Sequence, residues 1–362
     1  MTGGDARARL FRPAYPLEPL RATMPDAGGL LTLTGPDPLG VLESTLPVVR
    51  AARHVRIVPD AIARFAAGPG RQAPPAPIED RLHCTWLPPR RFLNYLLALE
   101  ALNFCFWDAE PRWRVAWGEA RHDGYWALAA ALHRALRDDA APLWDARYLA
   151  EMDEARLARL LRGEGRPAPL LAERARHLRE AGEALLSRWN GEFAQVVAAA
   201  EGDAAALVRK IVQEFPSFRD ETSWQGQPVR FYKRAQICVA DLARMLPGEG
   251  ARAHSLGRLR GLEHLTAFAD YKVPQVLRNL GILEYAPALA ARVDGLEELP
   301  AGGEEEVEIR AATVWACEAV ARELSAHLNS RVTSAGVDLW LWNEGQALGE
   351  LQPYHRTRTV YY

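Results

Sequence analysis

The sequence contains few lysines, no clustered cysteines and no long hydrophobic run. Only three of its 44 basic residues are lysine. The four cysteines, Cys84, Cys105, Cys238 and Cys317, do not have the Cys-x-x-Cys spacing of a structural zinc site, and they suggest no disulfide framework. We therefore expect no metal, no cofactor and a reducing, cytoplasmic environment.

The chain also lacks an excess of positive charge. Its formal net charge is −2 and its pI is about 6.5, which argues against a protein that wraps duplex nucleic acid. The first residues form no apolar stretch typical of a signal peptide, and no run approaches the length of a membrane span. With 49% hydrophobic and 25% charged residues, the composition indicates a globular protein with a sizeable core.

Glycine and proline divide the chain near residues 67–78, AGPGRQAPPAPI. This loop predicts an N-terminal section, residues 1–78, that packs on or leads into a body formed by residues 79–362. The two parts can also form one continuous globule, because no long linker separates them.

The pattern of apolar residues predicts a mostly α, multi-helix globule with a few short β ribbons. The expected helices are residues 93–107, 127–139, several between 144 and 215, and 304–328. Two short hairpins are expected at 112–126 and 222–232. Loops are expected at 247–252 and 299–303.

One candidate site lies in YKRAQICVADLARML, residues 232–246. Apolar residues recur at helical spacing from Arg234 onward, so Lys233 lies in or just before the first turn. A helix N-terminus carries partial positive charge, which makes this an unfavourable place for a cation. The lysine either extends to water or is held there to meet an anion.

A second candidate site lies in FADYKVPQVLRNLGIL, residues 268–283. The apolar spacing from Val273 and the position of Pro274 predict a helix that begins immediately after Asp270. An aspartate at this position favours a capping role when the segment is read alone. The same carboxylate, set among aromatic and apolar neighbours, is also a candidate for catalysis.

The two segments together resemble the helix-hairpin-helix DNA glycosylases. In that family a lysine that opens one helix and an aspartate that opens a later one flank the N-glycosidic bond to be cleaved. Here Lys233 and Asp270 match those positions, but no Gly-x-Gly hairpin precedes Lys233. Because that hairpin grips duplex phosphates, we expect no stable duplex nucleic acid as partner.

Longer motifs resemble the queuosine salvage family from about residue 80 to the C-terminus. They are FPSFRDETSWQGQPVRFYKRAQICVADL, LTAFADYKVPQVLRNLGILEY, EVEIRAATVWACE, DLWLW, PYHRTRTVYY, and ALNFCFW with GYW. The resemblance implies a queuosine 5′-phosphate N-glycosylase/hydrolase, which releases the base queuine. It also implies a helical fold related to the DNA glycosylases, a small nucleotide as substrate, and no membrane partner.

The resemblance implies roles for the two candidate residues. Cleavage of a ribosyl C–N bond passes through an oxocarbenium-like transition state, so Asp270 would stabilise positive charge at C1′ and could activate water. Lys233 would bind the 5′-phosphate, or protonate or orient the leaving base. Asp220 would accept from the guanine-like N–H edge of the base, or else act only as a turn cap.

Further residues are candidates for substrate binding. Glu308 and Arg310 either pair with each other or contact the base and the phosphate. His355, Arg356 and Arg358 form a cationic tail suited to phosphate. The other binding candidates are Phe218, Phe231, Tyr232, Tyr271 and His83.

Two other functions remain open at this stage. The first is a DNA or RNA base glycosylase, which would bind nucleic acid with steep salt dependence. The second is a non-catalytic binding protein for a modified 7-deazaguanine base, which would bind the base without turning over the nucleotide.

Overall fold

The computed structural model describes residues 29–68, 70, 82–246, 256, 258–347 and 351–362. These residues form two compact units. The first unit consists of the described parts of Met1–Pro77, Glu221–Phe231 and Glu263–Arg358, and the second of those of Ile78–Asp220, Tyr232–Leu262 and Thr359–Tyr362. The boundary expected near residue 78 stays a prediction. Most of the expected loop at 67–78 and all of the loop at 247–252 lie outside the described residues.

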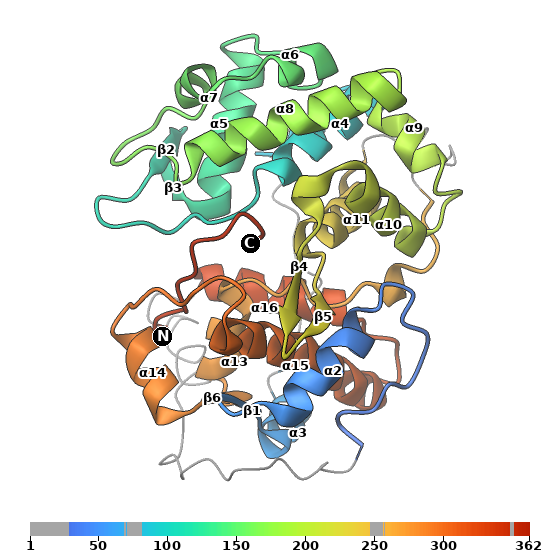
Figure 1. The fold of residues 1–362 in the computed structure, drawn as a ribbon, viewed down its shortest axis with the longest axis vertical. Helices are drawn as coiled ribbons and strands as arrows, with labels where there is room; N and C mark the ends of the chain where they lie inside the picture. The colour runs from blue at the N-terminus through green and yellow to red at the C-terminus, as the bar shows by residue number, and fades with distance from the viewer. Residues whose placement is uncertain (1–28, 69, 71–81, 247–255, 257, 348–350) are drawn as a thin grey trace. The chain divides into compact units, whose positions relative to one another are not determined.

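Helix α15 forms the centre of the first unit. It runs from Glu304 to Leu328, as the sequence predicts, and packs against α2, α3, α13 and α16 (Figure 1). A helix surrounded on all sides by protein needs small or apolar residues all round, and residues 306–317 are all buried. Three glutamates in its first turn are favoured by the helix dipole, and Asn329 ends it in the left-handed conformation with φ 48°.

The described residues of the first unit form five further α-helices. They are α2 (Val41–Ala51), α3 (Pro59–Ala67), α13 (Lys272–Asn279), α14 (Pro287–Asp294) and α16 (Ser334–Ala347). Two antiparallel strand pairs complete the unit: β1 (Val55–Ile57) with β6 (Leu283–Tyr285), and β4 (Glu221–Trp224) with β5 (Gln227–Arg230). The β1–β6 pair joins segments far apart in the sequence, and Arg56 and Glu284 form an ion pair across it.

The second unit is built around α4 (Pro89–Ala101), which is buried from Phe92 to its end. Helices α5, α8, α9 and α11 pack against it. Besides α4, the described residues of this unit form α5 (Gly124–Arg137), α6 (Ala146–Ala150), α7 (Glu154–Leu160), α8 (Leu171–Arg188), α9 (Phe193–Ala198), α10 (Ala204–Glu214) and α11 (Lys233–Met245). A short 3₁₀ turn, η2 (Pro216–Phe218), and the hairpin β2 (Arg114–Trp117) with β3 (Ala120–Asp123) complete it.

Two buried arginines hold the end of α4. Arg174 of α8 donates to the carbonyls of Phe104 and Cys105 at 2.5 and 2.9 Å, and also to that of Leu102. Arg234 of α11 donates to the carbonyls of Glu100 and Ala101 at 3.1 and 2.8 Å. The last carbonyls of a helix lack partners within the helix, so these guanidinium groups satisfy them and fix the loop that follows.

The expected secondary structure is confirmed in its main features. The protein is mostly helical, both hairpins form where they were expected, α15 has the expected bounds, and the helix expected at 127–139 is α5, shifted to Gly124–Arg137. The helix expected at 93–107 is instead α4, which ends at Ala101, so the prediction that residues 102–107 are helical is wrong. Arg174 binds the carbonyls of Leu102, Phe104 and Cys105 and holds this segment as a loop. No helix among the described residues combines the length and apolar character needed to cross a lipid bilayer. The relation to helix-hairpin-helix DNA glycosylases stays a prediction.

Candidate active site

Asp270 lies directly before α13 and both caps it and stays inside the protein. Its Oδ1 accepts the backbone N–H groups of Lys272 and Val273 at 2.8 and 2.9 Å, and the residue is only 7% exposed. The first N–H groups of a helix have no partner within the helix, so a carboxylate here is favoured. The expected capping role is therefore confirmed, and the two bonds fix the direction of the side chain.

The segment that carries Asp270 is fastened to two helices of the first unit. Arg310 of α15 donates from Nε to the carbonyl of Ala269 at 3.0 Å, one residue before the aspartate. Asp338 of α16 accepts the N–H of Phe268 at 2.9 Å. An extended segment has no helical hydrogen bonds of its own, so these side chains hold the backbone that positions the carboxylate.

Arg310 forms a buried cluster with aromatic and acidic neighbours in the same unit. Its Cζ lies 3.9 Å from the centre of the Phe231 ring, and its Nη1 is 3.6 Å from Glu306. Burial, and to a smaller extent the charge of Arg310, lowers the pKa of His355 to about 3. At neutral pH His355 is therefore an uncharged imidazole beside a guanidinium group.

The C-terminal tail is packed along the same region. Tyr354 packs against Tyr271 with ring centres 4.7 Å apart and ring planes tilted by 38°. The N–H of Leu299 donates to the carbonyl of Arg356 at 2.7 Å, and Arg358 pairs with Glu298 at 3.4 Å. Arg356 is half-buried and Arg358 is exposed.

The expected pairing of Glu308 with Arg310 is wrong. The Glu308 carboxylate instead accepts the N–H groups of Arg53 and His54, at 3.1 and 2.7 Å, before strand β1. Burial raises the pKa of Glu308, while these hydrogen bonds act in the opposite direction. Glu308 therefore joins α15 to β1, a contact between distant segments that the sequence did not reveal.

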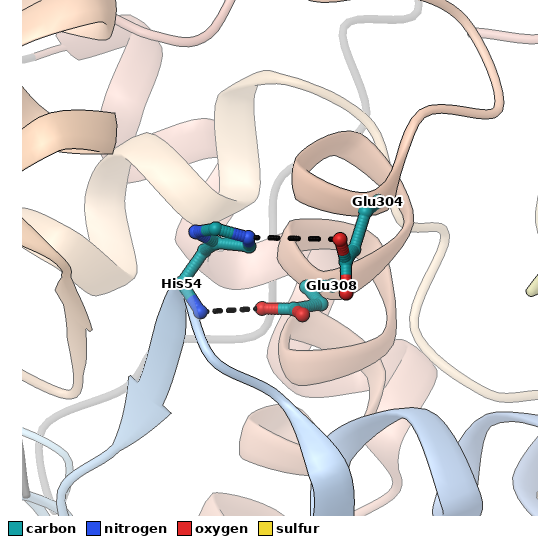
Figure 2. A group of neighbouring side chains, drawn as sticks. All are labelled: His54, Glu304 and Glu308. Atoms are coloured by element: carbon teal, nitrogen blue, oxygen red, sulfur yellow. Dashed lines mark hydrogen bonds and ion pairs between the residues drawn. The ribbon is translucent and has the colours of Figure 1, made fainter. Parts of the chain in front are cut away.

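Glu308 also belongs to a group that has the composition of a metal site. Figure 2 shows the His54 ring facing Glu304, with Nε2 3.9 Å from the carboxylate, and Glu308 one helical turn below. The candidate ligand atoms lie within 4.8 Å of one another. However, Glu304 is exposed and lies in the first turn of α15, where the helix dipole favours acidic residues without a metal. We assign no ion to this group.

Lys233 is the first residue of α11 in the second unit. It is 5% exposed, and its Nζ donates to the carbonyl of Asn103 at 3.2 Å, so the suggestion that it extends to water is wrong. The Oδ2 of Asp220 accepts the backbone N–H of Lys233 at 3.2 Å. Asp220 therefore caps α11, and this carboxylate offsets the unfavourable position of a cation at a helix N-terminus.

The aromatic candidates of the second unit are buried. Phe218 packs under the guanidinium group of Arg234, whose Cζ lies 4.7 Å from its ring centre. Tyr232 precedes α11 in the left-handed conformation, with φ 52°. His83 forms a hydrogen bond of 2.8 Å from its Nε2 to the hydroxyl of Tyr125.

Two acidic residues near Lys233 were not predicted from the sequence. Glu100 of α4 and Asp241 of α11 are both buried in the second unit. One signal was visible for Glu100, because it is the single charged residue in the apolar run LNYLLALEALNFCFW. A charged residue in a core helix is rarely buried without a partner. Asp241 gave no such signal, since ADLARM reads as an ordinary amphipathic helix.

Residues 83–362 match the family model described as queuosine salvage protein. The chain belongs to the queuosine salvage protein family. It is 51% identical over 330 residues to the queuosine 5′-phosphate N-glycosylase/hydrolase of Sphaerobacter thermophilus, covering 90% of this chain and 98% of the relative.

More distant relatives carry the same name. The protein from Bos taurus is 35% identical over 75% of this chain and 81% of its own length. The one from Dictyostelium discoideum is 36% identical over 74% of this chain and 78% of its own length. The family match begins at His83 and runs to the C-terminus, as the resemblance predicted from about residue 80, and it includes every predicted site residue.

Proposed function

We propose that this queuosine salvage protein hydrolyses the N-glycosidic bond of queuosine 5′-phosphate and releases queuine. The observation that carries the proposal is the Asp270 carboxylate, which is buried and aimed by two helix N–H groups. The relatives described above, which are named for this reaction, support it. Water adds its oxygen to C1′, the electrons of the C–N bond go to the base, and the base gains a proton.

In this proposal Asp270 stabilises the positive charge that develops at C1′. A fixed carboxylate acts most strongly where water is excluded, because the effective dielectric constant is low there. Its position is set before the substrate arrives, so little reorganisation is needed as charge develops. The same carboxylate orients or deprotonates the attacking water.

Lys233 supplies the positive charge that the nucleotide requires. Its ammonium group binds the 5′-phosphate, or orients and protonates the departing base. A 7-deazaguanine has carbon in place of N7, so a proton cannot be placed on that atom to assist departure. A buried lysine is suited to protonating the base, because its amine can change protonation state more readily than a guanidinium group.

The other candidate residues bind the substrate. We propose that Asp220 reads the N–H edge of the base and that Arg310, Arg356, Arg358 and His355 contribute to phosphate binding. Glu308 supports the site through its backbone contacts. Phe218, Phe231, Tyr232 and Tyr271 contribute aromatic contacts to the base, and His83 contributes to substrate binding. We further propose a cytoplasmic enzyme that binds no stable duplex nucleic acid, in keeping with its net charge of −2.

The test is a direct assay of base release. Wild-type protein incubated with queuosine 5′-phosphate should yield free queuine, measured by liquid chromatography. Asp270→Asn should lower the rate by about 10²–10⁴-fold, because it removes the charge but leaves the shape. Asp203→Asn is the matched control, since Asp203 caps α10 by accepting the N–H of Ala206 at 2.6 Å.

The outcomes separate the three functions. Full activity in Asp270→Asn would remove this residue from catalysis. Tight binding of queuine in calorimetry, with no release from the nucleotide, would indicate a binding protein. Retarded migration of duplex DNA at low salt, lost as salt rises, would indicate a nucleic-acid glycosylase.

A further inference from the structure

A fully buried carboxyl group lies near Lys233. Glu100 of α4 is 0% exposed. Its Oε2 accepts the side-chain N–H of Asn103 at 2.9 Å, whereas its Oε1 has no hydrogen-bond partner within the described chain. An ionised carboxylate needs several donors when it is removed from water, and one donor is too few. The local contacts therefore favour the neutral acid.

A second carboxyl group shares this environment. Asp241 of α11 is 7% exposed and accepts from Arg244 at 3.0 Å. Burial, followed by the charge of Asp241, raises the pKa of Glu100 to about 8. Burial also raises the pKa of Asp241, against the opposing charges of Arg244, His83 and Lys233. Two buried carboxyl groups that interact do not both ionise at neutral pH without a large cost, because each negative charge disfavours the other.

A short chain of contacts links this pair to Lys233. Asn103 donates from its amide to Glu100 and accepts the Lys233 ammonium at its backbone carbonyl, at 2.9 and 3.2 Å. The loop that carries Asn103 is fixed by Arg174, which donates to the neighbouring carbonyls. Glu100 therefore acts on Lys233 in two ways. One is the hydrogen bond to Asn103, whose carbonyl accepts from the lysine, and the other is the direct electrostatic interaction with the ammonium group.

The groups that face the carboxyl pair come from several elements. They are His83, Lys233, Arg234 and Arg244, together with the uncharged Tyr95, Tyr125 and Cys238. Arg244 bonds to Asp241, so its charge offsets one negative charge on the pair. A second negative charge on the pair would attract the Lys233 ammonium away from an anionic substrate.

We propose that Glu100 and Asp241 form a carboxyl pair that holds one proton at neutral pH and positions the Lys233 ammonium through Asn103. This proposal rests on the proposed function for its catalytic consequence. Glu100 and Asp241 are positioning residues and do not touch the substrate. Loss of the shared proton above about pH 8 adds the second negative charge, and kcat/KM falls there.

The kinetic test compares pH profiles of queuine release from pH 6 to 10. In wild type, kcat/KM should decline near pH 8. Glu100→Gln and Asp241→Asn each remove the second negative charge, so both should lose this decline while keeping activity at pH 7 within about tenfold.

Glu214→Gln is the control. Glu214 is also a mostly buried glutamate of this unit, paired with Arg188 at 2.6 Å, and the variant should keep the wild-type profile. A merely structural role would lower activity equally at every pH, and this result would overturn the proposal.

A second measurement does not depend on catalysis. Between pH 4.5 and about 8 the folded protein holds a proton on Glu100 that the unfolded chain releases, so stability should fall as pH rises through this window. The folding equilibrium constant of wild type should decline relative to Glu100→Gln by up to about tenfold per pH unit. Equal slopes would overturn the shared proton. If wild type releases no queuine but the slopes differ, the proposed function fails and the carboxyl pair stands.

Discussion

At the residue scale, the most consequential side chains are charged groups in places where water is excluded. Asp270, Lys233 and Arg310 are all buried, and each is held by backbone atoms. Removing a charged group from water is costly unless hydrogen bonds replace the hydration. These positions therefore lower stability relative to apolar residues, which is typical of residues retained for chemistry.

Arg310 offers a residue-scale prediction. Its planar group stacks on Phe231 and bonds to the carbonyl of Ala269 at the same time, which a lysine cannot do. Arg310→Lys should lower the free energy of unfolding by about 1.5–3 kcal/mol, the usual contribution of a hydrogen bond to a charged group. It should also lower kcat, because the segment that aims Asp270 loses its support.

Denaturant unfolding and the release assay measure the two effects. Arg331→Lys is the control, since Arg331 pairs with Glu263 at 3.3 Å on the surface and should change stability by less than about 0.5 kcal/mol. Equal stability in the two variants would show that the Arg310 contacts contribute nothing to the unit.

At the element scale, helix packing places the candidate residues. Helix α15 carries Glu308 and Arg310 one turn after its start, and α11 begins at Lys233. In the second unit, α8 packs so closely on α6 that only glycine fits at position 182. A Cβ there would lie 2.3 Å from the nitrogen of Ala150 and 2.5 Å from the carbonyl oxygen of Ala146.

This close contact predicts a large effect of a small substitution. Gly182→Ala should destabilise the protein by about 1–3 kcal/mol, since backbone atoms of α6 must move, despite the better helix propensity of alanine. Gly35→Ala is the control, because its Cβ would meet nothing within 4 Å. Thermal unfolding compares them, and an unchanged midpoint for Gly182→Ala would contradict the close approach of α6 and α8.

At the scale of the whole molecule, each unit contains a buried neutral histidine. Burial lowers the pKa of His177 in the second unit to about 3, with Arg234 as the next cause. The pKa of His355 in the first unit is also about 3. The unfolded chain binds a proton at each site below about pH 6.5, whereas the folded chain does not. Stability should therefore fall as pH drops from about 6.5 toward 3.

Replacing these histidines tests this linkage. His177→Gln should reduce the acid dependence of stability, at some cost at neutral pH, when unfolding is followed by circular dichroism between pH 4 and 7. His327→Gln is the control, because His327 is a partly exposed residue near Glu323, at 4.0 Å. An unchanged acid slope in His177→Gln would contradict a buried neutral imidazole.

Much of the fold was predictable from local pattern. Helical spacing predicted α15 over residues 304–328 and α11 from Lys233, and the Asp270 cap followed from its place before the apolar face of α13. These features depend on neighbours within a few residues, which the sequence displays directly. Long motifs likewise indicate the family from the sequence alone.

Helices α2 and α3 and the β1–β6 pair were not predicted. The sequence by itself determined the two hairpins, several helices including α11, α13 and α15, the family and the two candidate residues at helix starts. Only the tertiary structure decided the partners of those residues. It brought Asn103 to Lys233, Arg310 to Ala269 and Glu308 to the start of β1. It also decided which carboxyl groups are neutral, because desolvation depends on everything that packs around a group and not on its neighbours in the chain.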